Sequence, residues 1–191
     1  MRFLWDIIKK FLIIFIGSSV LAVVMYRYVP VYVTPLMVIR AVEQKQADKP
    51  IKLKHKWLSL DKISHNMVQA VVASEDNLFM EHNGFDFDQI EKAIKEAKSG
   101  KRNRGASTIS QQTAKNVFLW PGGGWFRKGL EAYFTILIEL IWDKHRIMEV
   151  YLNVIEMGDG IYGADALAWQ HFGRSADRLT RANCALIAAT L

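Results

Sequence analysis

The chain has 191 residues, of which 51% are hydrophobic and 23% charged, with a formal net charge of +6 and one cysteine. This length suffices for one globular domain with a core of its own. Half of the positive excess lies in residues 1–29, and the excess elsewhere is too weak to indicate a nucleic-acid partner. Cys184, the single cysteine, excludes an internal disulfide and a metal site built from several cysteines.

An uncharged apolar run, FLIIFIGSSVLAVVMY, occupies residues 11–26. It is slightly shorter than the roughly 20 residues of a membrane span, but the basic residues at its ends can snorkel. Three basic residues precede the run and only Arg27 follows closely, so the positive-inside rule places residues 1–10 in the cytoplasm. The sequence therefore predicts a transmembrane anchor over residues 11–28, with the rest of the chain outside the cytoplasm.

Two other interpretations of this run are open. A cleaved signal peptide has a similar basic start and apolar middle, but no small-x-small cleavage site follows, and residues 26–30 resemble an interfacial aromatic belt. A buried core helix would not need the charged flanks. Because residues 1–29 lack the amphipathic pattern of the chain downstream, we expect the anchor to form no part of the domain core.

Helical patterns dominate the remaining chain, and strand alternation is nearly absent, which predicts a mainly α protein. Residues 29–56 are predicted to be a juxtamembrane helix, at 34–46, and a connector. Asp61 is expected to cap a helix that carries Met67 and Val71 on its apolar face. Further helices are predicted over residues 87–98, 108–116, 125–143, 146–155, 164–172 and 180–191.

The first motif is residues 75–84, EDNLFMEHNG, which follow an apolar run at residues 67–73. A carboxylate set beside apolar surface is a useful general base, because desolvation favours its protonated form. A solvated helix end with a turn at Asn83-Gly84 is the simpler interpretation of this segment alone.

The second motif is residues 105–112, GASTISQQ, which gather three hydroxyls and two amides at a predicted helix start. Free N–H groups at a helix start suit an anion or a sugar. A simple N-cap would explain the Ser-Thr pair, but the two glutamines and Lys115 add donors that a cap does not need.

Two later motifs lie on predicted helices: Arg127-Lys128-x-x-Glu131, and Lys144-x-Arg146-x-x-Glu149-x-Tyr151-Leu152-Asn153. Read alone, each is a set of helix ion pairs worth about 0.2–0.5 kcal/mol per pair. Arg127 and Lys128 are about 100° apart on a helix. We therefore expect one of them to face a substrate while the other serves Glu131 or the membrane surface.

In this order the motifs resemble those of the peptidoglycan glycosyltransferases of family 51, particularly the monofunctional biosynthetic transglycosylases. The family patterns and their matches are E-D-x-x-F-x-x-H-x-G at Glu75, Asp76, Phe79, His82 and Gly84, G-x-S-T-[IL]-[TS]-Q-Q at residues 105–112, R-K-x-x-E at Arg127, Lys128 and Glu131, K-x-x-I-[LM]-E-x-Y-L-N at residues 144–153, and a fifth block at residues 160–173. We take residues 57–191 as the glycosyltransferase domain. Relatives usually continue past the last apolar helix, so its C-terminal end is expected to be truncated.

The resemblance implies a lysozyme-like α-helical fold and the polymerisation of lipid II into glycan strands with release of undecaprenyl diphosphate. It implies Glu75 as the general base and Glu131 as a second catalytic acid. The implied substrate-binding residues are Ser107, Thr108, Gln112, Lys115, Arg127 and Lys128. The implied supporting residues are Asp76, Phe79, His82 and Gly84.

The implied partners are lipid II, the growing glycan strand and membrane lipids, with cell-division or penicillin-binding proteins as open candidates and no nucleic acid. A divalent cation, magnesium or manganese, is left open with Glu131 as its candidate ligand, and no organic cofactor is expected. The expected location is the inner (cytoplasmic) membrane, with a single span and the catalytic domain on the periplasmic or extracytoplasmic side. Four aromatic side chains are expected to insert at headgroup level: Phe118, Trp120, Trp125 and Phe126.

A peptidoglycan-cleaving, lysozyme-like hydrolase or lytic enzyme is the main alternative. It too would use a Glu acid, but its leaving group is not a diphosphate, so it would not require Lys115, Arg127 and Lys128. A membrane-anchored scaffold without enzymatic activity would explain the anchor but not the motifs.

Overall fold

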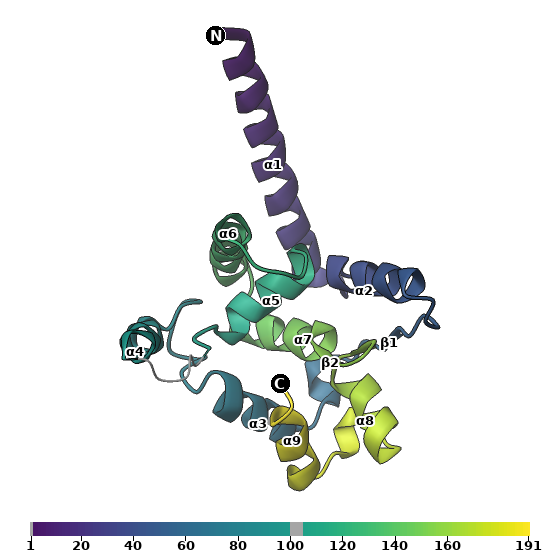
Figure 1. Ribbon diagram of the computed structural model, residues 1–191. Helices are drawn as coiled ribbons and strands as arrows, with labels where there is room; N and C mark the ends of the chain where they lie inside the picture. The colour runs from purple at the N-terminus through teal and green to yellow at the C-terminus, as the bar shows by residue number, and fades with distance from the viewer. Residues whose placement is uncertain (1, 100–104) are drawn as a thin grey trace.

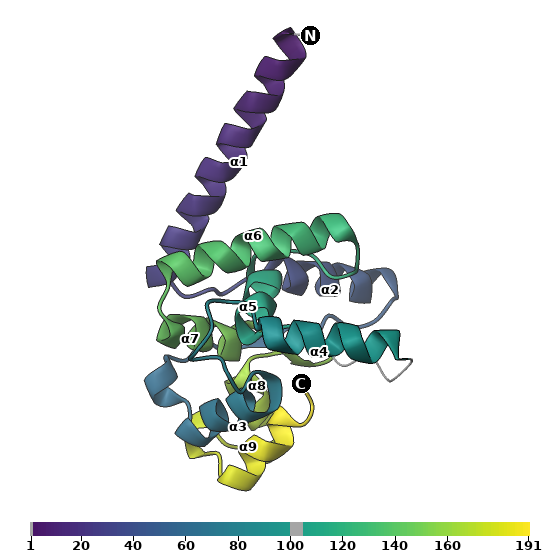
Figure 2. The ribbon, with the colours of Figure 1, turned by 90° about the vertical axis from the view of Figure 1, so that its left-hand side faces the viewer.

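One long helix, α1 (Arg2–Tyr28), rises from a body of shorter helices in the computed structural model, which describes residues 2–99 and 105–191 (Figures 1 and 2). The shorter helices of this described part are α2 (Pro35–Gln46), α3 (His65–Glu75), α4 (Phe87–Lys98), α5 (Ile109–Phe118), α6 (Trp125–Ile141), α7 (Lys144–Val154), α8 (Ala164–Phe172) and α9 (Arg181–Ala188), with 3-10 turns η1 (Leu60–Lys62) and η2 (Ala176–Arg178). The prediction of a mainly α protein is confirmed.

A small sheet ties the connector after α2 to the hairpin after α7. Its strands are β1 (Lys54–His55), β2 (Glu156–Gly158) and β3 (Ile161–Tyr162), in the order β1-β3-β2. Strands β1 and β3 run parallel, with Lys54 opposite Ile161, and β2 runs antiparallel to β3. Strands of two or three residues are too short to show alternation, which is why the sequence analysis did not predict them.

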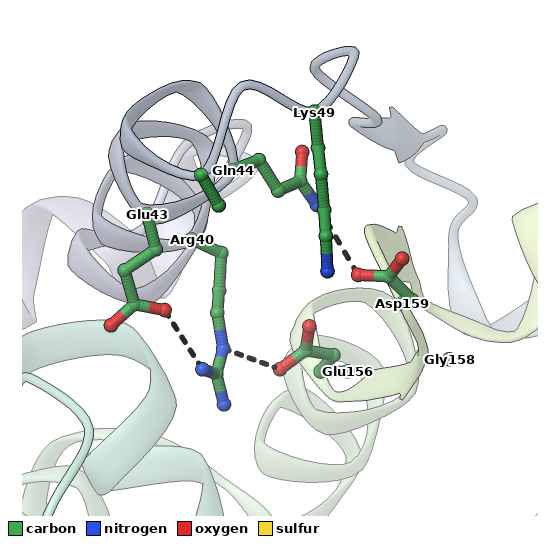
Figure 3. Close-up of a pocket in the computed structure, with 8 residues that line it drawn as sticks. Arg40, Glu43, Gln44, Lys49, Glu156, Gly158 and Asp159 are labelled. Atoms are coloured by element: carbon green, nitrogen blue, oxygen red, sulfur yellow. Dashed lines mark hydrogen bonds and ion pairs between the residues drawn. The ribbon is translucent and has the colours of Figure 1, made fainter.

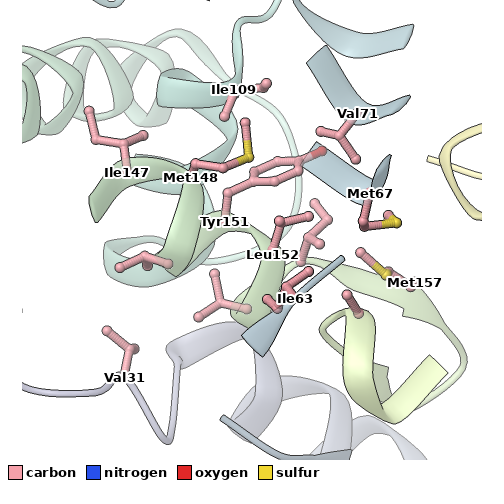
Figure 4. Close-up of a cluster of buried hydrophobic side chains, with 14 of the residues drawn as sticks. Val31, Ile63, Met67, Val71, Ile109, Ile147, Met148, Tyr151, Leu152 and Met157 are labelled. Carbon is pink, nitrogen blue, oxygen red and sulfur yellow. The ribbon is translucent and has the colours of Figure 1, made fainter. Parts of the chain in front are cut away.

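Helices α5 and α7 form the centre of the domain (Figure 4). Ile109 of α5 and Ile147, Tyr151 and Leu152 of α7 are fully buried between the elements. Helix α6 packs against α5, and α3 packs against α9. Because α3, α5 and α6 carry the motif residues, this core fixes the relative positions of the site residues.

The last turns of α1 dock onto the domain. By length and composition, α1 is apolar enough to cross a membrane, and most of its apolar side chains are exposed. Val23, however, is fully buried and its carbonyl accepts a hydrogen bond from Trp142 Nε1 (2.8 Å), while the hydroxyls of Ser19 and Tyr133 lie 2.7 Å apart. The expectation that the anchor forms no part of the core is therefore wrong for these turns.

The predicted helices over residues 34–46, 87–98 and 164–172 are confirmed to within one residue. The predicted cap at Asp61 is wrong, because that residue lies in η1 and α3 begins only at His65.

One of the four aromatic residues expected at the membrane has a different environment. Phe118 packs against the core, with its ring stacked on Phe134 at a centroid distance of 4.5 Å. Trp125 and Phe126, at the start of α6, are instead 94% and 76% exposed.

Candidate active site

A cavity of about 520 Å³ opens where the end of α3 meets the start of α5. Glu75, the last residue of α3, lines this cavity and is half-buried. Ser107, Gln112 and Asp86, the N-cap of α4, also line it. The fold thus brings the first two motifs together around one cavity, whose lining includes the carboxylates of Glu75, Asp76 and Asp86.

The Glu75 carboxylate belongs to a chain of hydrogen bonds. Gln112 Nε2 donates to Glu75 Oε2 (2.9 Å), and the Tyr151 hydroxyl donates to Gln112 Oε1 (3.3 Å). Burial, reinforced by the charges of Glu75 and Asp76, raises the pKa of Tyr151 above its ordinary value, so its hydroxyl remains a donor. These two hydrogen bonds fix the orientation of the Gln112 amide. Tyr151 is a site residue that the sequence analysis did not assign, although the fourth motif contains it.

Asp76 joins the first motif to the start of α5. Its Oδ2 accepts a hydrogen bond from the backbone N–H of Ile109 (3.0 Å), and its Oδ1 lies 2.9 Å from His82 Nε2. His82 Nδ1 accepts a hydrogen bond from the backbone N–H of Gly84 (3.1 Å), so the ring proton is on Nε2. Nε2 therefore donates a hydrogen bond to Asp76. These contacts fit the supporting role expected of Asp76 and His82, since they hold the segment that follows Glu75.

Gly84 and Thr108 make a second connection between the two motifs. Thr108 Oγ1 donates to the Gly84 carbonyl (2.7 Å) and accepts from the backbone N–H of Gln111 (3.2 Å). The hydroxyl expected to bind substrate is thus engaged by protein groups. Gly84 has φ +89°, and a Cβ there would lie 2.7 Å from Thr135 Cγ2, so the position requires glycine. Phe79, also expected to be supporting, is a buried core residue.

A polar centre around Glu139 and Lys144 was not found from the sequence. Lys144 Nζ donates to Glu139 Oε1 (2.8 Å) and to the His82 carbonyl (2.7 Å), and it lies 4.6 Å from the centroid of the Phe79 ring. The Ser110 hydroxyl also hydrogen-bonds Glu139. The available signal was a single acid within the apolar run TILIELI at residues 135–141, because an acid there needs a partner.

A second cavity, of about 350 Å³, lies among residues of α2, α5 and the start of α6. Gln112 lines both cavities and so connects Glu75 to a group of cations. Lys115 and Arg127 line this second cavity. Burial lowers the pKa of Lys115 below its ordinary value, while nearby Glu131 opposes that shift and Arg127 adds to it.

The buried carboxylate of Glu131 pairs with both cations of its own motif. Arg127 Nη1 donates to Oε2 (3.0 Å), and Lys128 Nζ donates to Oε1. Both positions serve Glu131 because i+3 and i+4 neighbours lie on one helix face. They differ in exposure, since the Arg127 side chain is 12% exposed and that of Lys128 is 45% exposed. Only Arg127 of the two lines the second cavity.

Glu131 does not fit the role of metal ligand that the sequence left open. Both of its carboxylate oxygens already accept hydrogen bonds from cations, Oε2 from Arg127 and Oε1 from Lys128, so neither is left for a metal. Within residues 2–99 and 105–191, no group of three His, Cys, Asp or Glu side chains is placed to hold a metal ion.

Comparison with known proteins gives a consistent result. Residues 43–191 match the transglycosylase family. A biosynthetic peptidoglycan transglycosylase of Bacteroides thetaiotaomicron is 64% identical over 184 residues, which cover 96% of this chain and 74% of the relative. Proteins of the same name from Bdellovibrio bacteriovorus and Caulobacter vibrioides are 53% and 52% identical over the whole chain, covering 78% and 80% of those relatives. With the helical architecture, these matches confirm the predicted lysozyme-like fold class behind an N-terminal apolar helix.

Proposed function

Because this chain belongs to the transglycosylase family, we propose that it polymerises lipid II into glycan strands and releases undecaprenyl diphosphate. It is a peptidoglycan glycosyltransferase of cell-wall synthesis, and its substrates are lipid II and the growing strand. The observation that carries the mechanism is the connection at Gln112 between a cavity lined by Glu75 and a cavity lined by cations. Glycosyl transfer from a diphosphate needs both a base and cationic compensation of the leaving group.

Glu75 serves as the general base in this proposal. It takes the proton from the 4-hydroxyl of lipid II as that oxygen attacks the anomeric carbon of the donor strand. The new C–O bond forms while the bond from the anomeric carbon to the diphosphate oxygen breaks, so one displacement inverts the configuration. Gln112 positions Oε2 of Glu75, and among the described residues no donor hydrogen-bonds Oε1, which is left to accept the proton.

Lys115 and Arg127 compensate the charge of the departing diphosphate, which leaves with the bonding electron pair. The ion pair with Glu131 fixes the Arg127 guanidinium in the cavity wall. Glu131 therefore acts through the two cations that it holds, as a positioning residue. Ser107, exposed at the rim of the first cavity, is placed to contact sugar hydroxyls.

We place α1 across the inner membrane, with the domain on the periplasmic or extracytoplasmic side. The length of α1 and the basic residues at its N-terminus support this orientation. A lipid-linked substrate stays in the bilayer, and a domain docked on the last turns of α1 is held beside that bilayer.

The arrangement of the acids speaks against the hydrolase alternative. A lysozyme-like hydrolase pairs its catalytic Glu with a second available carboxylate. Asp76 is engaged by His82 and a backbone amide, Asp86 accepts the backbone N–H of Gln89 as the N-cap of α4, and Glu131 is engaged by two cations.

Incubation of the full chain with labelled lipid II in detergent tests this function. We expect Glu75→Gln to lower the polymerisation rate by about 10²–10⁴-fold, the usual contribution of a general base, without changing the thermal unfolding midpoint. Glu81→Gln, an exposed acid of the same motif, is the matched control and should keep full activity. Retention of more than half of the rate by Glu75→Gln would exclude it as the base, and clearing of insoluble peptidoglycan would favour the hydrolase.

A further inference from the structure

The second cavity contains a third cation, which none of the motifs includes. Arg40 of α2 lines this cavity together with Lys115 and Arg127. It lies upstream of residues 43–191, which match the family. We propose, resting on the function above, that Arg40 binds the diphosphate of the lipid-linked substrate.

Two carboxylates hold the Arg40 guanidinium in place, as Figure 3 shows in a close-up of a neighbouring pocket that Arg40 and Glu156 also line. Nη1 donates to Glu43 Oε2 (2.9 Å), and Nε donates to Glu156 Oε2 (3.3 Å). Within the described residues Nη2 has no hydrogen-bond partner, and the side chain is 43% exposed. A guanidinium held on two sides and open on the third is preorganised for an anion, because little side-chain freedom remains to be lost on binding.

Donors without acceptors also point to an anionic ligand in this cavity. Asn116 Nδ2 and Arg127 Nε are both buried and have no hydrogen-bond partner in the described part of the chain. Asn116 lines the cavity and is only 3% exposed, so bulk water does not easily satisfy its free N–H. A diphosphate brings acceptor oxygens for the orphan donors and for Arg40 Nη2, and negative charge for Lys115, while Arg40 and Arg127 are each already paired with carboxylates.

The position of the cavity suits a lipid-linked ligand. In both views α2 and α6 lie at the level where α1 joins the domain (Figures 1 and 2). With α1 across a membrane, α2 and α6, which both contribute to the lining of the cavity, lie on the membrane side of the domain. The diphosphate of a lipid-linked sugar lies at that level, because its lipid stays in the bilayer.

Steady-state kinetics with lipid II test the proposal. Arg40→Gln should raise KM by about 10–100-fold, the worth of a hydrogen bond to a charged group, and Arg40→Lys should recover part of the loss because it keeps the charge. Lys45→Gln is the matched control, because it removes the same charge from an exposed position of the same helix. Its KM should equal that of the wild type. An unchanged KM for Arg40→Gln overturns the proposal.

Arg40 could instead have only a structural role, as the ion pair with Glu156 that joins α2 to β2. Glu156→Gln distinguishes this role from diphosphate binding. This change breaks the same ion pair but leaves the cation and removes a negative charge from the cavity wall. The Gln carbonyl oxygen still accepts the hydrogen bond from Arg40 Nε, so the guanidinium stays oriented, and diphosphate binding predicts an unchanged or lower KM for Glu156→Gln. A purely structural role predicts that Glu156→Gln and Arg40→Gln raise KM and lower the unfolding midpoint equally, and that result overturns the proposal.

Binding without turnover separates this inference from the proposed function. In a Glu75→Gln background, Arg40→Gln should raise the Kd for labelled lipid II by about the same 10–100-fold. An equal Kd with and without Arg40 overturns the inference alone. Full polymerisation by Glu75→Gln would instead count against the proposed base, whatever the Kd values.

Discussion

Most of the motif side chains contact one another, and few are free to contact a substrate. Asp76 and Thr108 join the first motif to the second, and Lys144 joins the fourth motif to His82. Substitutions at these residues should impair folding and activity together. Glu75, which is half-buried at a cavity, should affect activity alone.

The ammonium of Lys115 gives a pH-dependent prediction at the residue scale. Burial lowers its pKa below the ordinary value of 10.5, and only the charged form neutralises a diphosphate. The KM for lipid II should therefore rise with pH as Lys115 loses its proton, starting at a lower pH than an ordinary lysine would give. Lys115→Arg stays charged and should flatten the rise. Identical pH profiles of KM for the two proteins would contradict this assignment.

Helix α1 has two roles at the scale of elements, because its first turns are exposed and its last turns are part of the domain. Val23 is buried in the core, and Arg146 donates hydrogen bonds to the carbonyls of Tyr26 (2.7 Å) and Val29 (2.6 Å). The end of α1 is thereby held by α6 and α7, which fixes the helix relative to the site.

Two truncations test this docking. Deletion of residues 1–17 keeps Val23 and its contacts, whereas deletion of residues 1–29 removes them and leaves Trp142 Nε1 without its acceptor. Burial of a valine side chain alone is worth about 1.5–3 kcal/mol. The longer deletion should therefore unfold at a lower temperature in the same detergent, by roughly 2–4 °C for each kcal/mol lost. Equal midpoints for the two truncated proteins would show that docking contributes nothing to stability.

At the scale of the whole molecule, the exposed aromatic residues Trp125 and Phe126 lie at the start of α6, on the side of the domain from which α1 rises (Figure 2). We expect this end of α6 to insert at headgroup level when α1 spans the membrane.

An environment-sensitive fluorophore on Trp125→Cys of the full chain in liposomes measures this insertion. Its emission should be shifted to the blue compared with that of the same fluorophore attached to a small thiol in buffer without detergent. The same label on Trp169→Cys of α8, an exposed position far from α1, is the control and should not shift. Native Cys184 is buried and should remain unlabelled. Equal spectra at the two positions would contradict the insertion.

The sequence by itself determined the features that depend on near neighbours in the chain. Periodicity and capping residues predicted α2, α4 and α8, the apolar run predicted a helix long enough to cross a membrane, and the ordered motifs identified the family. Each helix pattern, apolar run or motif is a local signal, because it lies within a segment of about 30 residues or fewer.

Only the tertiary structure decided which of these pieces meet. The bond from Trp142 to Val23 spans 119 residues, and that from Tyr151 to Gln112 spans 39. No periodicity encodes which apolar faces pack together, so the docking of α1 and the cavity that Arg40 and Lys115 line together could not be predicted. Thr108 illustrates the same limit, because a hydroxyl at a helix start suits a ligand or a cap equally well until packing places the Gly84 carbonyl within its reach.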